Sequence, residues 1–431
     1  MRILKAGSSE ATAFLRALGE RARTPEPAVE AAVRRVLEDV RAKGDAALFA
    51  YAEKFDGVHL AADTVRVGQA EIEAAAGTLE AATLEALALA AKRIEAFHRR
   101  QHRESWFFQE DGAGLLGQLV RPLGRVGLYV PGGTAAYPST VLMNAIPARV
   151  AGVEDLIMCT PVNRGRSIPA AVLAAAHLTG IREIYRVGGA QAVAAMAYGT
   201  ESIRAVDKIV GPGNIYVATA KRLLFGAVGI DMVAGPSEVL IVADGTASAN
   251  WIAADLLAQA EHDPRASTIC LTPSVALAEG VRAELERQLL ELPRAEVARE
   301  ALRAWGALIV VADLAEAMVI ANAVAPEHLE LMVADPWALL PQVQSAGALF
   351  LGAYTPEAAG DYLAGPNHVL PTSGSARWGS PLSVEDFQKR CSLLCIEPRA
   401  LSGWRGSITR LARLEGLEAH ARSITIRTDS L

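Results

Sequence analysis

Gln259 and His262 form the pattern in this sequence that most suggests a metal site. They lie in Leu256-Leu-Ala-Gln-Ala-Glu-His262 and are three positions apart. If this stretch is helical, both side chains leave one helical face near its end and could share a metal ion. The alternative is that His262 is a surface residue favoured by the helix dipole. The spacing differs from the His-Glu-x-x-His pattern of zinc proteases, so further ligands must come from distant segments.

Glu327 and His328 place an acid beside an imidazole directly after Pro326. The proline predicts that a helix starts here. Adjacent residues point in different directions, so each side chain could accept a proton separately. The alternative is an acid that the dipole favours in the first helical turn, beside an uninvolved histidine. The sequence alone leaves both interpretations open.

The segment from Gly360 to Pro371 is rich in Gly and Pro and carries Asp361, Asn367 and His368. Polar side chains on such a shaped loop favour a binding site over packing. Four similar loops occur earlier, at Tyr129–Gly133, Gly188–Gln191, Gly211–Asn214 and Gly235–Glu238. The first three follow predicted strands, where α/β folds bind ligands. None has the G-x-G-x-x-G fingerprint of dinucleotide sites, and each taken alone could be a plain turn.

The elements that must position these residues form two α/β units. Residues 26–105 have the periodicity of helices. Strands are expected at residues 126–130, 156–159, 183–187 and 208–210, and again at 239–243, 267–271, 307–311 and 348–351, with a helix at 251–261. Strands that alternate with Ala-rich helices predict parallel sheets. From about residue 383 the chain is expected to be helical and more polar, with a strand-like end at Ile424–Arg427.

Composition excludes several classes of protein. The chain has 431 residues, enough for two or three domains, and a net charge of -6, which argues against nucleic-acid binding. No apolar run reaches membrane length, and the first residues lack the apolar core of a signal peptide. Cys159 and Cys270 lie in apolar runs and are expected to be buried, inert thiols. We therefore expect a cytoplasmic protein without nucleic-acid or membrane partners.

Taken in order, these segments resemble the histidinol dehydrogenases, and the resemblance covers nearly the whole chain. The segments that carry it are 124–133, 188–191, 207–214, 231–238, 259–262, 326–328, 365–368 and 380–384. Enzymes of that family oxidise L-histidinol through L-histidinal to L-histidine, reduce two NAD in succession and use one zinc ion. The resemblance implies two Rossmann-like α/β domains in an aldehyde-dehydrogenase-like architecture, with small helical appendages at the N-terminus and C-terminus.

The resemblance also implies roles for individual residues. The zinc ligands would be Gln259, His262, Asp361 and His420. His328 would be the general base, and Glu327 would activate the water that converts the aldehyde to the acid. The substrate would contact Ser237, Gln259, His262, His328, Asp361, His368, Glu415 and His420, and NAD would contact Tyr129, Gln191 and Asn214.

The same resemblance divides the chain into four parts. Residues 1–24 would be an N-terminal appendage, and residues 25–128 together with 237–382 a larger α/β domain that carries most of the metal site. Residues 129–236 would form the NAD-contacting domain, and residues 383–431 a tail that reaches the partner subunit of a homodimer. Each site would then be built from two chains, and an isolated monomer would have an incomplete metal shell.

Three other functions compete with this one. The nearest is a dehydrogenase on the same scaffold that oxidises another small primary alcohol, such as a sulfonated diol; Glu415 argues against it, because a carboxylate attracts ammonium and repels sulfonate. A zinc hydrolase would use Glu327 as a base on metal-bound water and would leave the strand-end loops without a role. A non-catalytic regulator would not need the acid and base pair.

Overall fold

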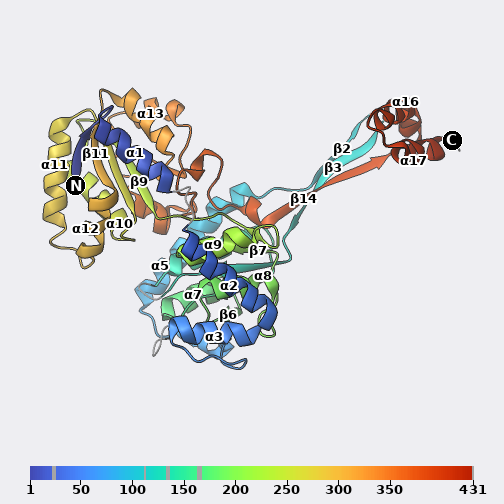
Figure 1. Ribbon diagram of the computed structural model, residues 1–431, viewed down its shortest axis with the longest axis horizontal. Helices are drawn as coiled ribbons and strands as arrows, with labels where there is room; N and C mark the ends of the chain where they lie inside the picture. Colours follow the sequence, from blue (N-terminus) through green and yellow to red (C-terminus); the bar gives the residue numbers. More distant parts are fainter. Residues whose placement is uncertain (22–25, 111–112, 133–135, 163–166, 430–431) are drawn as a thin grey trace.

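The structure consists of two lobes and a long arm (Figure 1). It is a computed structural model that describes residues 1–21, 26–110, 113–132, 136–162 and 167–429. One lobe contains a six-stranded parallel sheet, the other a five-stranded parallel sheet, and the arm a three-stranded antiparallel sheet. The predicted α/β class with two parallel units is confirmed.

The six-stranded sheet carries helices on both faces. Its strand order is β1 (Arg2–Lys5), β11 (Gly306–Val310), β10 (Ser267–Thr272), β9 (Glu238–Ala243), β12 (His328–Met332) and β13 (Ala348–Leu351). Helices α10 (Ala249–Ala260), α11 (Val275–Gln288) and α12 (Ala295–Trp305) share one core cluster with it, and α1 (Ser9–Arg21) and α13 (Leu314–Val324) share another. Burial on both faces explains the apolar run from Val239 to Ala243 in β9.

The N-terminal residues belong to this lobe rather than forming an appendage. β1 pairs in parallel with β11, and Phe14 and Leu18 of α1 are buried in the core. A four-residue strand at the edge of a sheet carries too little periodicity to be recognised in a sequence.

The five-stranded sheet has the order β6 (Glu183–Tyr185), β5 (Asp155–Cys159), β4 (Arg125–Tyr129), β7 (Lys208–Val210) and β8 (Gly229–Ile230). One face is covered by α2 (Pro27–Lys43), α3 (Asp45–Asp56), α8 (Gly189–Tyr198) and α9 (Ile215–Leu224). The other face is covered by α4 (Gln69–Ala76), α5 (Ala81–His98), α6 (Pro138–Val150) and α7 (Ala170–Leu178). Cys159 lies in this core and Cys270 in that of the other lobe, both as buried free thiols, as expected.

The helices from α2 to α5 therefore pack on the five-stranded sheet. The division expected from the sequence placed residues 25–128 with residues 237–382, on the other lobe. Periodicity identifies the buried face of an amphipathic helix but contains no information about which sheet will cover it.

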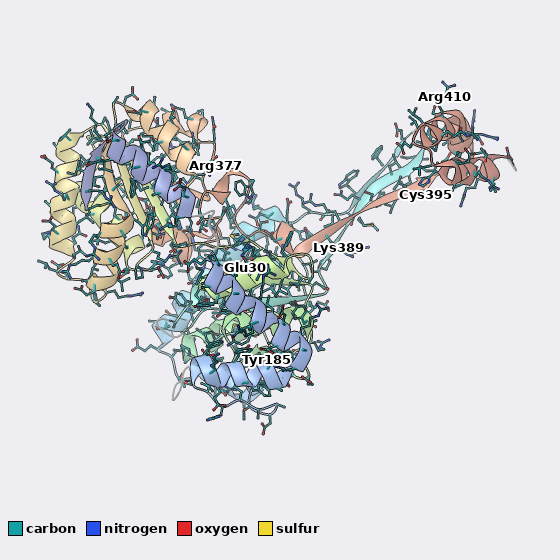
Figure 2. All side chains as sticks on the ribbon, viewed as in Figure 1. Glu30, Tyr185, Arg377, Lys389, Cys395 and Arg410 are labelled. Atoms are coloured by element: carbon teal, nitrogen blue, oxygen red, sulfur yellow. The ribbon has the colours of Figure 1, made fainter. Side chains whose placement is uncertain are left out.

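The arm combines two segments that are far apart in the sequence. Strands β2 (Trp106–Glu110), β3 (Gly114–Pro122) and β14 (Gln388–Ile396) form its antiparallel sheet, and α16 (Pro398–Leu414) and α17 (Glu418–Thr428) lie at its tip (Figure 1). Figure 2 marks its course with Lys389, Cys395 and Arg410.

Two expectations about this region are wrong. β14 is a strand where a helix was expected, and Ile424–Arg427 lies inside α17 rather than in a strand. The β-branched residues there read as a strand, but packing of α17 against α16 overrides this local preference.

Among the described helices, no single one is both long and apolar enough to cross a membrane. Gln69–Ala76 and Ala81–Gln101 meet that requirement only as a pair, and the pair is bent by 106°.

Candidate functional site

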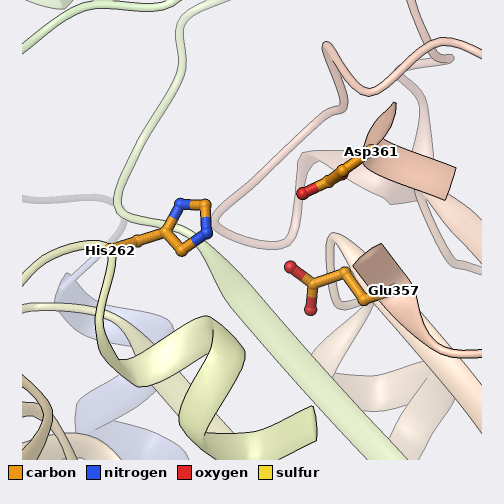
Figure 3. Close-up of side chains that lie close together, drawn as sticks. All are labelled: His262, Glu357 and Asp361. Carbon is orange, nitrogen blue, oxygen red and sulfur yellow. The ribbon is translucent and has the colours of Figure 1, made fainter. Parts of the chain in front are cut away.

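Three side chains from two segments of the chain point toward one another (Figure 3). They are His262, Glu357 and Asp361, and one potential metal-binding atom from each lies within 4.8 Å of the others. His262 follows α10, Glu357 begins the short helix α15 (Glu357–Ala359), and Asp361 lies in the π-helix η3 (Gly360–Ala364) that continues it. One imidazole nitrogen and two carboxylate oxygens form a donor set that suits zinc.

Gln259 joins this group from the last turn of α10, where it is fully buried. Its amide lies against the carboxylate of Glu357. α10 ends at Ala260, so His262 lies in the following turn, where its backbone N–H donates to the carbonyl of Gln259 at 3.3 Å. The expectation that both residues share one helical face is therefore wrong for His262, although the structure brings Gln259, His262 and Asp361 to one place.

His328 is the first residue of strand β12 and Glu327 directly precedes it, so a strand and not a helix starts here. Pro326 begins an extended segment here, because the parallel pairing of His328 with Val239 of β9 fixes the backbone as a strand. The two side chains nevertheless converge, with Oε2 of Glu327 3.7 Å from Nδ1 of His328, so the expectation that they point in different directions is wrong. Glu327 precedes the strand, and the alternation of side chains along a strand therefore does not apply to it.

The ring of His328 is buried and has a defined tautomer. Its Nδ1 lies 2.9 Å from the backbone carbonyl of Glu238, and because a carbonyl can only accept, Nδ1 carries the hydrogen. Burial lowers the pKa of His328 to about 3, so the ring is neutral at pH 7. Nε2 then holds a lone pair; it has no hydrogen-bond partner among the described residues and lies 3.9 Å from Oδ1 of Asp361.

The carboxyl group of Glu327 is also buried. Its Oε2 accepts from the backbone N–H of Glu238 at 2.9 Å. Burial raises the pKa of Glu327 well above its ordinary value, and the neighbouring carboxyl groups of Glu238 and Asp361 raise it further. A carboxylate in this setting has a strong affinity for a proton and can act as a general base.

His368 faces the same group, with its Nδ1 4.0 Å from Oδ1 of Asp361. The loop is held by the preceding residue, because Nδ2 of Asn367 donates to the carbonyl of Met143 in α6 at 2.7 Å. The site therefore lies where the two lobes meet. Ser237 directly precedes β9 and is half-buried.

The expected substrate and metal residues that lie in the lobes, rather than on the arm, gather at the amino ends of β9 and β12. Most open α/β sheets bind ligands at the carboxyl ends of their strands. The expectation that ligands bind where strands end, which fits the loops of the five-stranded lobe, therefore did not identify the site at the amino ends of β9 and β12. Glu357 was missed as well; its spacing of four residues from Asp361 was the only signal in the sequence.

The three expected cofactor residues lie at the carboxyl ends of strands in the five-stranded sheet. Tyr129 ends β4, and its hydroxyl accepts from the N–H of Gly189 at 3.0 Å. Gln191 is buried in the first turn of α8, and Asn214 caps α9 by accepting from two backbone N–H groups. β5 and β7 lie on opposite sides of β4, so the strand order reverses at β4. The carboxyl end of β4 is therefore the switch point of the sheet, where such folds bind ligands. Gly133, the last residue of the loop after β4, lies outside the described residues.

A buried ion pair supports the loop that carries Asn214. Lys221 and Asp231 pair with each other, and they bind the carbonyl and the N–H of Gly211 at 2.9 Å and 2.8 Å. Gly211 has φ of +109°, and a Cβ there would lie 2.1 Å from the carbonyl oxygen of Tyr129. The loop thus requires glycine at this position. Sequence reasoning missed this pair; a lysine on the apolar face of α9 was the available signal.

Glu415 and His420 do not join the other site residues of the same chain. Glu415 follows α16, His420 lies in the first turn of α17, and both are exposed at the tip of the arm. Figure 1 shows that tip far from α10 and β9.

The fold and the site together define a two-lobed α/β enzyme with a buried base at the junction of its lobes. The model of the histidinol dehydrogenase family matches residues 19–428. A histidinol dehydrogenase of Syntrophotalea carbinolica is 53% identical over 99% of both chains, and one of Geobacillus kaustophilus is 54% identical over 94% of this chain and 96% of its own. The crystal structure of histidinol dehydrogenase from Elizabethkingia anophelis has a TM-score of 0.89, with 38% identity over 94% of both chains.

The chain therefore belongs to the histidinol dehydrogenase family, whose enzymes catalyse the final step of histidine biosynthesis. The expected family and function are confirmed.

Proposed function

We propose that this oxidoreductase converts L-histidinol through L-histidinal to L-histidine with two NAD and one zinc ion. The observation that carries this proposal is the free Nε2 of His328, a neutral and buried base beside Asp361. His328 takes the proton of the alcohol at Nε2, returns it to the aldehyde oxygen when water adds, and takes a proton from the resulting hydrate in the second oxidation. Glu327 takes a proton from the water that forms the hydrate.

The zinc ligands in this proposal are Gln259, His262 and Asp361, together with His420 of the partner subunit. The convergence of the first three supports it. Bound zinc would hold the amine and imidazole groups of the substrate, a role that a nitrogen and oxygen ligand set allows. Ser237 and His368 would line the substrate, and the carboxylate of the partner subunit's Glu415 would meet its ammonium group.

NAD would bind along the carboxyl ends of β4, β6 and β7. Tyr129, Gln191 and Asn214 belong to loops that meet at the switch point, which supports this location. Bound NAD supplies the hydride acceptor for both oxidations.

The arm supports a homodimer with shared sites. It projects from the lobes and carries exposed apolar side chains, including Trp106 and Phe107 on β2 and Leu411 and Leu414 on α16. Exposed apolar groups of this size usually mark an interface. The cytoplasmic location and the absence of nucleic-acid and membrane partners stay predictions.

The proposal is tested by following NADH formation with purified protein, L-histidinol, NAD and zinc. We expect two NADH for each L-histidine formed, and loss of activity when a chelator removes the metal. If histidinol gives no NADH while another small primary alcohol does, the enzyme acts on a different substrate of the same scaffold. Cleavage of esters or amides without NAD would favour a zinc hydrolase instead.

A further inference from the structure

Arg21 is the last residue of α1, and its side chain is buried, with only 7% of its surface exposed. The guanidinium group lies over the ring of Trp305, 4.3 Å from the ring centroid. Nη1 donates to the backbone carbonyl of Arg265 at 2.6 Å, and Nη2 lies 3.6 Å from Oε1 of Glu238. One cation of the first helix therefore joins the segment between His262 and β10 to the start of β9.

Glu238 is held through its side chain and holds its neighbours through its backbone. Its buried carboxylate accepts from the N–H of Ser373 at 3.1 Å, which ties β9 to the loop that carries His368. Its own N–H donates to the carboxyl group of Glu327, and its carbonyl accepts from Nδ1 of His328, both at 2.9 Å. A rotation of the backbone at Glu238 would therefore move both proposed bases.

The charges of Arg21 and Glu238 depend on each other. Within the described part of the chain, neither side chain forms an ion pair with any other residue. Nη2 of Arg21 makes no hydrogen bond among the described residues, so the contact with Glu238 acts through charge alone. Removal of one partner of a buried pair leaves the other charge without compensation. Loss of Arg21 would then displace the side chain of Glu238, and with it the backbone that orients the two bases.

A second buried arginine forms ion pairs that have no contact with the site. Arg125 begins β4, its side chain is 8% exposed, and it pairs with Asp155 and Glu183. These residues lie at the amino end of β4, whereas the expected cofactor residue Tyr129 lies at its carboxyl end. Arg125 and Arg21 are thus equally buried, but only the partner of Arg21 contacts the bases.

We propose that Arg21 is a positioning residue of the active site, which fixes the orientation of Glu327 and His328 through Glu238. This inference rests on the proposed function, in which those two residues are the bases. The role requires no contact between Arg21 and the substrate or the cofactor. The first helix of the chain, which the sequence led us to expect in an appendage, then contributes to catalysis.

The test compares the steady-state kinetics of wild type and Arg21→Met with L-histidinol at saturating NAD, well below the unfolding temperature of either protein. Methionine keeps an apolar contact with Trp305 but has no charge. We expect kcat to fall about 10- to 100-fold because the bases are misplaced. KM for histidinol should stay within about threefold of wild type, because the zinc ligands that hold the substrate remain.

Arg125→Met is the matched control. It removes an equally buried arginine and should also lower the unfolding temperature, but we expect kcat to stay within about twofold of wild type. An equal fall of kcat in both variants would show a general loosening of the protein and would overturn the inference. A kcat of Arg21→Met within about threefold of wild type would overturn it as well.

The double variant Arg21→Met with Glu238→Gln shows whether Arg21 acts through Glu238. The amide oxygen at position 238 can still accept from the N–H of Ser373, but the unpaired charge is gone. We expect kcat to be at least about threefold higher than in Arg21→Met alone. A double variant that is no more active than Arg21→Met would contradict the proposed route.

If Arg21→Met does not fold, Arg21→Lys takes its place. The ammonium group keeps the charge but cannot bind the Arg265 carbonyl and Glu238 together as the planar guanidinium does, so we expect kcat to fall at least about threefold. An unchanged kcat in this variant overturns the inference.

A crystal structure of the variant that folds gives a readout independent of activity. The distance from Nδ1 of His328 to the carbonyl oxygen of Glu238 should exceed about 3.5 Å, and an unchanged contact overturns the inference. A wild type that does not oxidise histidinol would instead contradict the proposed function, and the crystal structure would still decide the role of Arg21.

Discussion

The backbone of one residue, Glu238, holds both proposed bases of the site. The N–H of Glu238 binds the carboxyl group of Glu327, and the carbonyl of the same residue binds Nδ1 of His328. Residue 238 begins β9, an interior strand of the six-stranded sheet, so both bases are fixed to the backbone of that strand. A buried base whose orientation is fixed by hydrogen bonds does not need to rearrange when the substrate binds.

Replacing His328 should affect catalysis and spare the metal. For His328→Ala we expect kcat to fall about 10²- to 10⁴-fold, because the proton acceptor is lost while the zinc ligands remain. NADH formation and the zinc content of the purified protein measure the two effects. His177→Ala, an exposed histidine of α7, is the control and should behave as wild type. A kcat within about threefold of wild type would remove His328 from the mechanism.

Residue types in the sequence indicated most of the candidate site but not its geometry. The family resemblance pointed to Gln259, His262 and Asp361, and the structure brings them together. Glu357 could not be found in this way, because its closeness to His262 exists only once β13 and α15 have folded back along β12. Contacts between distant segments have no local signature in a sequence.

Individual elements differ in how clearly the sequence encodes them. Strands buried on both faces, such as β9 and β10, were predicted to within a residue or two, because they are continuous apolar runs between loops. β12 was missed, since His328 and Glu330 interrupt its apolar pattern, although both are buried in the folded protein. The functional demand for polar groups inside a strand hides that strand from pattern analysis.

At the end of α3, the ionised form of Asp56 is unfavourable, and the stability of the protein should therefore depend on pH. Asp56 is the last residue of the helix, where the dipole disfavours negative charge, and it is half-buried. Burial raises the pKa of Asp56 to about 6. The folded state therefore keeps the proton in a range where the unfolded chain has lost it, so the free energy of unfolding falls as pH rises from about 4 to about 6.

Asp56→Asn removes this conflict. At pH 8 we expect the variant to be more stable than wild type by about 1 kcal/mol, a figure reduced for solvent screening of a half-buried group. At pH 4 the two proteins should unfold with equal free energies. Urea unfolding at both pH values measures the difference. A stabilisation that is the same at pH 4 and pH 8 would mean that the ionisation of Asp56 is not its cause.

At the scale of the whole molecule, the arm separates two parts of the proposed site. The tip that carries Glu415 and His420 lies far from the lobes of its own chain (Figure 1). The sheet of the arm joins β2 and β3, which lie between α5 and β4 in the sequence, to β14, which follows the strands of both lobes. An exposed, apolar and projecting element of this kind suits the exchange of segments between two copies of a chain. Only the family resemblance predicted that the tail reaches a partner subunit, because the local sequence pattern of this segment is typical of a solvated helix.

Mixing two inactive variants tests this exchange. His420→Ala and His262→Ala should each have low activity, because each lacks a residue of every site. In a mixed dimer one of the two sites receives an intact His262 from one chain and an intact His420 from the other. Random reassociation should therefore restore about a quarter of wild-type activity. Tagged subunits and mass measurement confirm that mixed dimers form; their presence without restored activity would show that sites are not shared.

The construction of the arm also affects how the protein is made. The hairpin of β2 and β3 leaves the ribosome early, but β14, which pairs with the whole length of β3, follows only after the intervening residues 123–387 have been synthesised. At ordinary rates of translation this gap lasts on the order of 10 to 50 seconds. Throughout that time the nascent chain displays an unpaired strand edge beside Trp106 and Phe107. Until β14 arrives, this edge is open to pairing with other chains, which makes the hairpin a site of association during synthesis.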